Sequence, residues 1–129
     1  MNNRGLEVII MVGLPASGKS TIAKVNYTSY YLISLDEIEN HSREIEEALI
    51  EENLAKGNSI VIADTNLTRE TRVGHIKIAR KYNAYIVAVY LDIPIEQILK
   101  RNRNREEPVP DATIFRMKKE LELPTYAEG

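Results

Sequence analysis

Residues 13–20 read GLPASGKS, a pattern of the form G-x-x-x-x-G-K-S that is suited to binding phosphate. The glycines of such a loop let backbone N–H groups turn inward toward phosphate oxygens. Lys19 would then place a positive charge on the outer phosphates, and the Ser20 hydroxyl would bind Mg²⁺. The alternative is a strand-to-helix turn whose glycines serve only the turn. The predicted nucleotide-binding residues are Gly13, Pro15, Ala16, Ser17, Gly18, Lys19, Ser20 and Thr21.

An acid, Asp36, follows the apolar segment 30–35. In a kinase, a carboxylate at this place can take the proton of an attacking hydroxyl during phosphoryl transfer. Asp36 and Glu39 also have the spacing of a helix capping box. The two roles are compatible, because a capping residue is held rigidly at the end of a strand.

A second acid, Asp64, follows the apolar run 60–63 and precedes Thr65. An acid at the end of a buried strand beside a phosphate loop typically contacts substrate or a water molecule on Mg²⁺. Its alternative is a turn and helix cap before Thr68.

The densest basic run of the chain is KRNRNR at 100–105. Arg101 and Arg105 are four residues apart and would share one helix face. Such cations can close over a nucleotide and neutralise charge on the transferred phosphoryl group. The alternative is a solvated helix face near the C-terminal end, where the helix dipole favours basic residues. His41 and His75 are interpreted as surface or cap residues.

Alternating strands and helices must position these residues. Periodicity and breaker residues predict strands at 6–12, 30–35, 59–63 and 84–91, and helices at 18–24, 42–56, 68–82, 94–104 and 111–122. Repeated strand–helix–strand units favour an α/β fold with about four parallel strands and helices on both faces. Ligands bind at the carboxyl ends of the strands of such a sheet, so the acids and the loop are expected on one rim.

Composition narrows the class of protein. A chain of 129 residues predicts a single domain, 1–129. The absence of cysteine excludes disulfides and cysteine-based metal sites. A net charge of −2 argues against an indiscriminate nucleic-acid coat but is compatible with a local basic groove. The N-terminal apolar run is too short for a membrane span, so a cytoplasmic location is expected.

The chain resembles the 5′-kinase domain of phage-type polynucleotide kinases, a P-loop fold of the adenylate-kinase type with an arginine-bearing lid. The resemblance rests on GLPASGKST at 13–21, SLDE at 34–37, ADTNLTRETR at 63–72, ARKYN at 79–83, LDIP at 91–94 and ILKRNRNREEPVPDATIFRMKK at 98–119. Many small kinases share the first motif. The DTN motif and the KRN segment are more specific.

The resemblance implies transfer of phosphate from ATP, with Mg²⁺, to the 5′-hydroxyl end of DNA or RNA in nucleic-acid end repair. It implies that Asp36 is the general base, that Asp64 and Thr65 line the acceptor side, and that Arg101 and Arg105 are lid arginines acting with Lys19. One departure is Glu39, which stands where the family often carries an arginine that meets the phosphate backbone of the acceptor.

Three hypotheses follow. The first is a polynucleotide 5′-hydroxyl kinase, and the second is a kinase of a small hydroxyl metabolite or nucleoside, which Glu39 favours. The third is a nucleotide-binding module without catalysis, which has no use for acids on the acceptor side.

Overall fold

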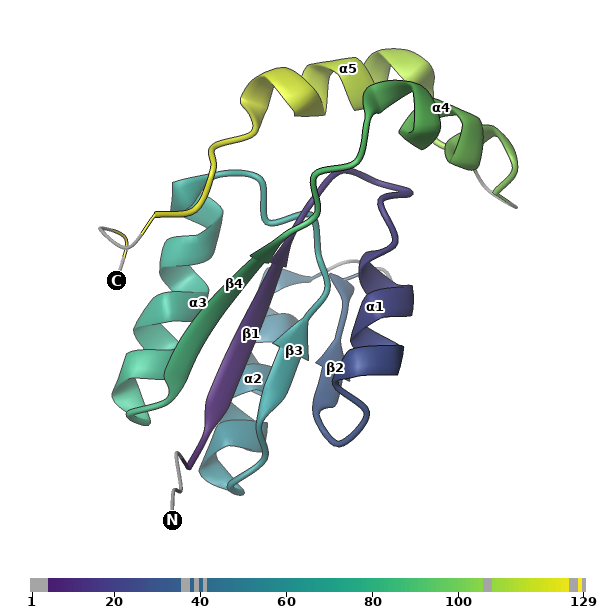
Figure 1. Cartoon of the computed structure of the whole chain (residues 1–129). Coiled ribbons are helices and arrows are strands. Elements are labelled where there is room, and N and C mark those ends of the chain that lie inside the picture. Colours follow the sequence, from purple (N-terminus) through teal and green to yellow (C-terminus); the bar gives the residue numbers. More distant parts are fainter. Residues whose placement is uncertain are drawn as a thin grey trace.

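The computed structural model describes residues 5–35, 38, 40, 42–105, 108–125 and 128. Its centre is a sheet of four parallel strands in the order β2-β3-β1-β4 (Figure 1). The strands are β1 (Glu7–Val12), β2 (Tyr31–Ile33), β3 (Ile60–Ile62) and β4 (Tyr85–Tyr90). The predicted α/β fold is therefore confirmed, although β2 and β3 are shorter than their sequence patterns suggest.

Within the described residues, five helices accompany the sheet. They are α1 (Lys19–Asn26), α2 (Arg43–Ala55), α3 (Arg69–Lys81), α4 (Ile95–Arg103) and α5 (Asp111–Glu120). Ser42 and Thr68 lie just before α2 and α3 and are N-caps, because their hydroxyls accept hydrogen bonds from the backbone N–H groups of Ile45 and Thr71.

The central strand β1 is buried on both faces, as a parallel sheet covered by helices requires. Its alternate residues therefore belong to two different cores. Val8 and Ile10 pack in the core formed with α2 and α3, whereas Ile9 and Met11 pack with Ala23 of α1. Figure 1 shows α1 on one side of the sheet and α2 and α3 on the other.

A third apolar cluster joins α4 and α5 to the end of the sheet. Ile98 and Ile114 are fully buried there against Leu14 and Leu67. In Figure 1 these two helices cross over the end of the molecule toward which β1 and β4 point. This packing places the basic residues of α4 above the loop that follows β1.

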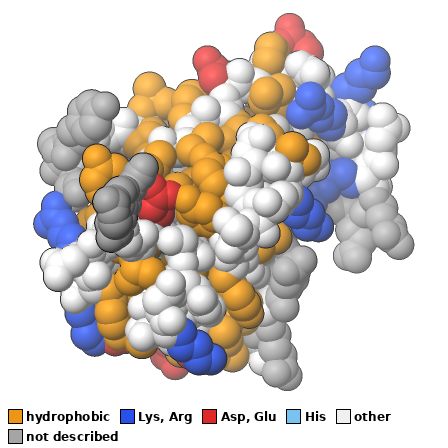
Figure 2. Space-filling model, turned by 60° about the horizontal axis from the view of Figure 1, so that its bottom comes forward, with side chains coloured by type: hydrophobic (Ala, Val, Ile, Leu, Met, Phe, Trp, Pro, Cys, Tyr) orange, Lys and Arg blue, Asp and Glu red, His pale blue; other side chains and the backbone are white. Residues whose placement is uncertain are grey.

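The face of the molecule shown in Figure 2 carries many apolar side chains. Tyr85 and Tyr90 of the edge strand β4 are among the exposed large ones, as is Tyr31 of β2. In the described part of the chain, no helix has the length and apolar character needed to cross a bilayer.

Replacement of Ile50 by alanine tests the core between α2 and the sheet. The Ile50 side chain is fully buried, so Ile50→Ala is expected to lower the free energy of unfolding by about 2–5 kcal/mol. Ile45 lies on the same helix but is 43% exposed, and Ile45→Ala is expected to cost within about 0.5 kcal/mol. Urea denaturation of both variants measures the difference, and equal costs would contradict this packing.

Candidate active site

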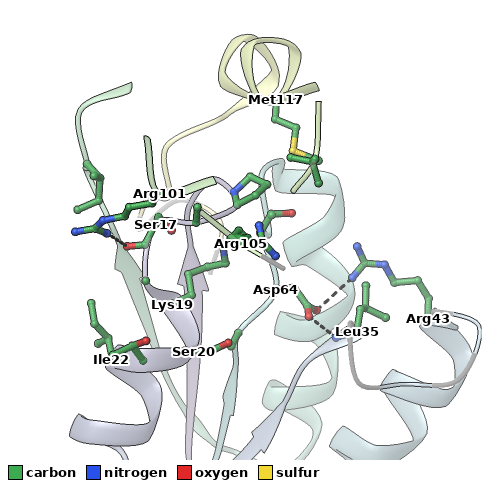
Figure 3. Close-up of a pocket in the computed structure, with 18 residues that line it drawn as sticks. Ser17, Lys19, Ser20, Ile22, Leu35, Arg43, Asp64, Arg101, Arg105 and Met117 are labelled. Carbon is green, nitrogen blue, oxygen red and sulfur yellow. Dashed lines mark hydrogen bonds and ion pairs between the residues drawn. The ribbon is translucent and has the colours of Figure 1, made fainter. Parts of the chain in front are cut away.

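The carboxyl ends of the strands meet at an open pocket of about 850 Å³ (Figure 3). Pro15 to Thr21 line one part of it, and Leu35, Asp64 and Thr65 line another. Arg101 and Arg105 reach it from α4 and from the segment that follows α4. The structure therefore brings together the phosphate loop, one predicted acid and both predicted lid arginines, as expected for the rim of a parallel sheet.

The phosphate loop wraps around the ammonium group of Lys19. The Lys19 Nζ donates hydrogen bonds to the carbonyl oxygens of Gly13 at 3.0 Å and Leu14 at 2.8 Å. Gly18 has a φ of +97°, which glycine adopts without strain, and it directly precedes α1. The loop therefore ends at a helix N-terminus, where backbone N–H groups and the helix dipole favour an anion.

Two further observations fit this loop to phosphate. A Cβ atom at Gly13 would lie 2.7 Å from the Ser17 Oγ, so glycine permits the close approach of the two segments. Among the described residues the Ser17 Oγ is buried and has no hydrogen-bond partner. A buried hydroxyl on the pocket wall without a partner suits a ligand that offers hydrogen-bond acceptors.

Asp64 connects β3 to the end of β2. Its Oδ1 accepts a hydrogen bond of 2.7 Å from the backbone N–H of Leu35, and its Oδ2 lies 3.7 Å from the Nη1 of Arg43. Both interactions are drawn in Figure 3. The alternative of a helix cap at Asp64 is wrong, because Thr68 caps α3. Asp64 is instead a buried carboxylate on the pocket wall.

Arg43, which sequence reasoning missed, lies on the same side of the pocket. It begins α2, and its Nη1 donates a hydrogen bond of 3.1 Å to the Oε1 of Glu46. Its side chain is 47% exposed. The sequence held one signal for Arg43. It is a cation in the first turn of the predicted helix 42–56, where acids are normally favoured.

The basic run 100–105 divides between pocket and solvent. Arg101 lies close to the loop, with its Nη1 3.5 Å from the Ser17 carbonyl oxygen, and Arg105 also lines the pocket. Arg103 instead pairs with Asp111 at 3.2 Å. The buried amide of Asn102 bonds both backbone groups of Val109, and this contact fixes the turn that follows α4. The solvated-face alternative therefore applies to Arg103.

Behind the pocket wall lies a buried polar cluster of Glu46, Asp64 and His75. His75 is 2% exposed, so its interpretation as a surface residue was wrong. Burial lowers the pKa of His75 to about 4, and the ring is neutral near pH 7. Burial, with the neighbouring carboxyl group of Asp64, raises the pKa of Glu46 to about 9.

Asp36 and Glu39 lie outside the described residues. Their predicted roles as general base and substrate contact therefore stay predictions. Leu35, which precedes Asp36 in the sequence, lines the pocket.

Comparison with known proteins adds relatives to this geometry. The sequence matches the model of the AAA domain family over residues 8–124. It is 30% identical to the bifunctional polynucleotide phosphatase/kinase of Schizosaccharomyces pombe, over 95% of this chain and 31% of that protein. It is 28% identical to the L-seryl-tRNA(Sec) kinase of Methanococcus maripaludis, over 91% of this chain and 53% of that protein. The chain thus spans about a third of the length of the first relative and about half of the length of the second.

A solved structure shares the fold. A gluconokinase from Sinorhizobium meliloti 1021 superimposes with a TM-score of 0.67 at 20% identity, over 96% of this chain and 79% of that one. At this level of identity the likeness concerns the fold alone.

Replacement of Lys19 tests the phosphate loop. Lys19→Ala is expected to weaken ATP binding by about 10- to 100-fold, because a charge-assisted contact contributes about 1.5–3 kcal/mol. Lys24 is exposed on the same helix, and Lys24→Ala is the matched control. Isothermal titration calorimetry with ATP measures both affinities. Equal affinities in the two variants would place the nucleotide elsewhere.

Proposed function

Since the chain belongs to the AAA domain family and has the fold of a P-loop kinase, we propose that it transfers the γ-phosphate of ATP to the 5′-hydroxyl end of DNA or RNA. One observation carries the proposal. A single pocket joins the phosphate loop to the lid arginines on one side and to Asp64 and Arg43 on the other. Such a pocket offers one place for a phosphoryl donor and another for its acceptor.

On the donor side, the loop and the N-terminus of α1 bind the phosphates of ATP. Lys19 neutralises charge on the outer phosphates, and the exposed hydroxyl of Ser20 on the pocket wall suits one ligand position of Mg²⁺. This donor set fits the ion, because Mg²⁺ in kinases typically takes one or two protein oxygens and fills its other positions with phosphate oxygens and water. When bound, Mg²⁺ supplies charge neutralisation at the phosphates.

Arg101 and Arg105 supply positive charge from the lid. Negative charge spreads over the oxygens of the phosphoryl group as it moves, and cations held above it stabilise the transition state. The apolar packing of Ile98 and Ile114 holds α4 and α5 over the loop, so these charges are positioned before the reaction begins.

On the acceptor side, Asp36 takes the proton of the attacking hydroxyl, and Thr65 and Asp64 line the path of the acceptor. Arg43 adds a cation on that side. It therefore offers a contact for acceptor phosphate in a chain that has Glu39 where the resemblance led us to expect an arginine.

A second candidate acceptor is an aminoacylated tRNA. Its support is the similarity to an L-seryl-tRNA(Sec) kinase over 91% of this chain. A seryl-tRNA also combines a hydroxyl with nucleic-acid phosphates, so the same features of the pocket support both acceptors. A small hydroxyl metabolite is the third candidate acceptor, and its binding does not require Arg43.

A transfer assay distinguishes the three acceptors. With γ-labelled ATP and Mg²⁺, label is expected on a 5′-hydroxyl oligonucleotide, and both omission of Mg²⁺ and Asp36→Ala are expected to abolish the transfer. Asp36→Ala is expected to leave the affinity for ATP unchanged, because a general base acts on the acceptor.

Seryl-tRNA and a free nucleoside serve as the competing acceptors in the same assay. Absence of label on both DNA and RNA ends, with label on seryl-tRNA or on a nucleoside, would overturn the 5′-hydroxyl proposal. Loss of ATP binding in Asp36→Ala would show that Asp36 is structural.

Two arginines of one basic run provide a matched test of the lid. Arg105→Ala is expected to reduce turnover by about 10²-fold or more, because a cation aimed at the transferred phosphoryl group is lost. Arg103 pairs with Asp111 away from the pocket, so Arg103→Ala is expected to change turnover by no more than about twofold. Steady-state kinetics at saturating ATP measures both, and equal losses would assign Arg105 to the solvated face.

A further inference from the structure

The carboxyl groups of Glu46 and Asp64 are buried behind the acceptor side of the pocket, with ligand atoms within 4.8 Å of each other. Among the described residues, the Glu46 Oε2 and the Asp64 Oδ2 are buried and have no hydrogen-bond partner. Glu46 is fully buried, and Asp64 is 7% exposed. Two ionised carboxylates that are buried side by side repel each other and lose their hydration. A proton or a cation between them must therefore compensate the charge.

We propose that Glu46 is a neutral carboxylic acid that donates its proton to Asp64, accepts a hydrogen bond from Arg43, and so acts as a positioning residue for the acceptor side. One proton on the Glu46 Oε2 satisfies both orphan oxygens. The Oε1 is already an acceptor, because the Nη1 of Arg43 donates to it at 3.1 Å. The role in positioning rests on the proposed function, whereas the protonation state does not.

The proton resides on Glu46 because the contacts of the two acids differ. The Asp64 Oδ1 accepts a hydrogen bond of 2.7 Å from the backbone N–H of Leu35, so this oxygen is already engaged as an acceptor. Glu46 has no such donor from the backbone among the described residues, and its burial is complete. Burial and the contact with Asp64 accordingly raise the pKa of Glu46 to about 9, despite the nearby charge of Arg43.

A metal ion is the competing way to join the two oxygens. Glu46, Asp64 and His75 each offer a ligand atom, and these atoms lie within 4.8 Å of one another. However, the Asn66 Nδ2 donates to the Met11 carbonyl oxygen at 2.7 Å, so the Asn66 Oδ1 must be an acceptor. The His75 Nε2, 3.2 Å from that oxygen and 3.9 Å from the Glu46 Oε1, is then the protonated nitrogen, so the ring nitrogen beside Glu46 cannot bind a metal. The lone pair of the ring is on the Nδ1, which is buried without a partner among the described residues.

Arg43 is a second argument against a metal. Its guanidinium lies 3.1 Å from Glu46 and 3.7 Å from Asp64, and it already supplies the positive charge of the cluster. A divalent ion between the same acids would be repelled by it.

Neutral Glu46 has a consequence for the acceptor. With Glu46 ionised, two acids would face one arginine and the acceptor side would carry a net negative charge. With Glu46 neutral, the charges of Arg43 and Asp64 balance, and no hydrogen bond from the Nε or Nη2 of Arg43 is found among the described residues. These donors suit a phosphate of the acceptor.

The variants Glu46→Gln and Glu46→Ala distinguish a neutral Glu46 that positions the acceptor side from a Glu46 with a merely structural role. An amide donates to Asp64 and accepts from Arg43 as the neutral acid does, so Glu46→Gln is expected to keep the KM for a 5′-hydroxyl oligonucleotide within about threefold at pH 7. Glu46→Ala is expected to raise that KM by about tenfold or more, with the affinity for ATP unchanged, because the lost hydrogen bonds act only on the acceptor side. Glu47→Gln is the matched control, since Glu47 is the exposed neighbour on α2.

A titration decides the protonation state without any activity. Carboxyl carbons labelled with ¹³C are followed by NMR, and the signal absent from Glu46→Gln is assigned to Glu46. That signal is expected to show no ionisation between pH 5 and pH 7, in line with a pKa of about 9. Ionisation near the ordinary value of 4.5 would overturn the proposal.

Stability gives a second measure that is independent of activity. Unfolded Glu46 ionises near pH 4.5 while the folded protein keeps the proton to about pH 9, so rising pH between these values destabilises the wild type relative to Glu46→Gln. Between these two pH values, the unfolding equilibrium constants of the wild type and of Glu46→Gln are expected to diverge by up to about tenfold per pH unit. The groups that face Glu46 are Arg43 of α2, Asp64 after β3 and His75 of α3, and all remain in both proteins.

The alternatives have distinct outcomes. A melting temperature that rises with added Zn²⁺ or Mn²⁺ in the wild type, but not in Glu46→Gln, would replace the proton by a metal and overturn the proposal. If no acceptor is phosphorylated but the NMR titration shows neutral Glu46, the proposed function fails while the protonation of Glu46 stands. If Glu46→Gln loses the acceptor as Glu46→Ala does, Glu46 acts as an anion and the proposal fails.

Discussion

The parallel alignment of β1 with its two neighbours is the constraint on which the rest of the structure depends. Strand β1 pairs with β3 on one side and with β4 on the other, so the carboxyl ends of all three lie at the same edge. Two backbone hydrogen bonds continue the alignment beyond the strands, from Gly13 to Thr65 and from Leu91 to Val12. The phosphate loop, the segment that contains Asp64 and the segment that leads to α4 therefore begin next to one another at this edge.

The second requirement is that charge buried near this edge be compensated. Asp64 is held by a backbone N–H group and by Arg43, and it lies against Glu46. Removal of any one partner would leave a buried charge or an unsatisfied polar atom, at a cost larger than the strength of a single surface ion pair. The same contacts hold a carboxylate and a guanidinium on the pocket wall, so the stability of this edge and the layout of the pocket depend on one set of interactions.

Sequence reasoning succeeded where the signal is local. The phosphate loop is read from adjacent residues, and the elements follow from periodicity. The four strands and five helices of the described part of the chain were therefore predicted, with boundaries off by a few residues. It failed for His75, whose polarity suggested the surface. His75 is buried because Asn66, nine residues earlier, offers its ring an acceptor. Arg72 on the same helix is buried in the same way, since Glu128 binds its guanidinium from 56 residues away.

The sequence by itself determined the α/β fold, the phosphate loop and the basic run from which Arg101 and Arg105 reach the pocket, because each depends on residues that are neighbours in the chain or repeat with a fixed period. Only the tertiary structure decided which polar residues work together. Arg43 and Asp64 are 21 positions apart and meet only because the end of β2 places the start of α2 beside the end of β3. Within the basic run, Arg105 lines the pocket, whereas Arg103 pairs with Asp111. Spacing alone does not encode such a choice, since it depends on the packing of α4 and α5 against the loop.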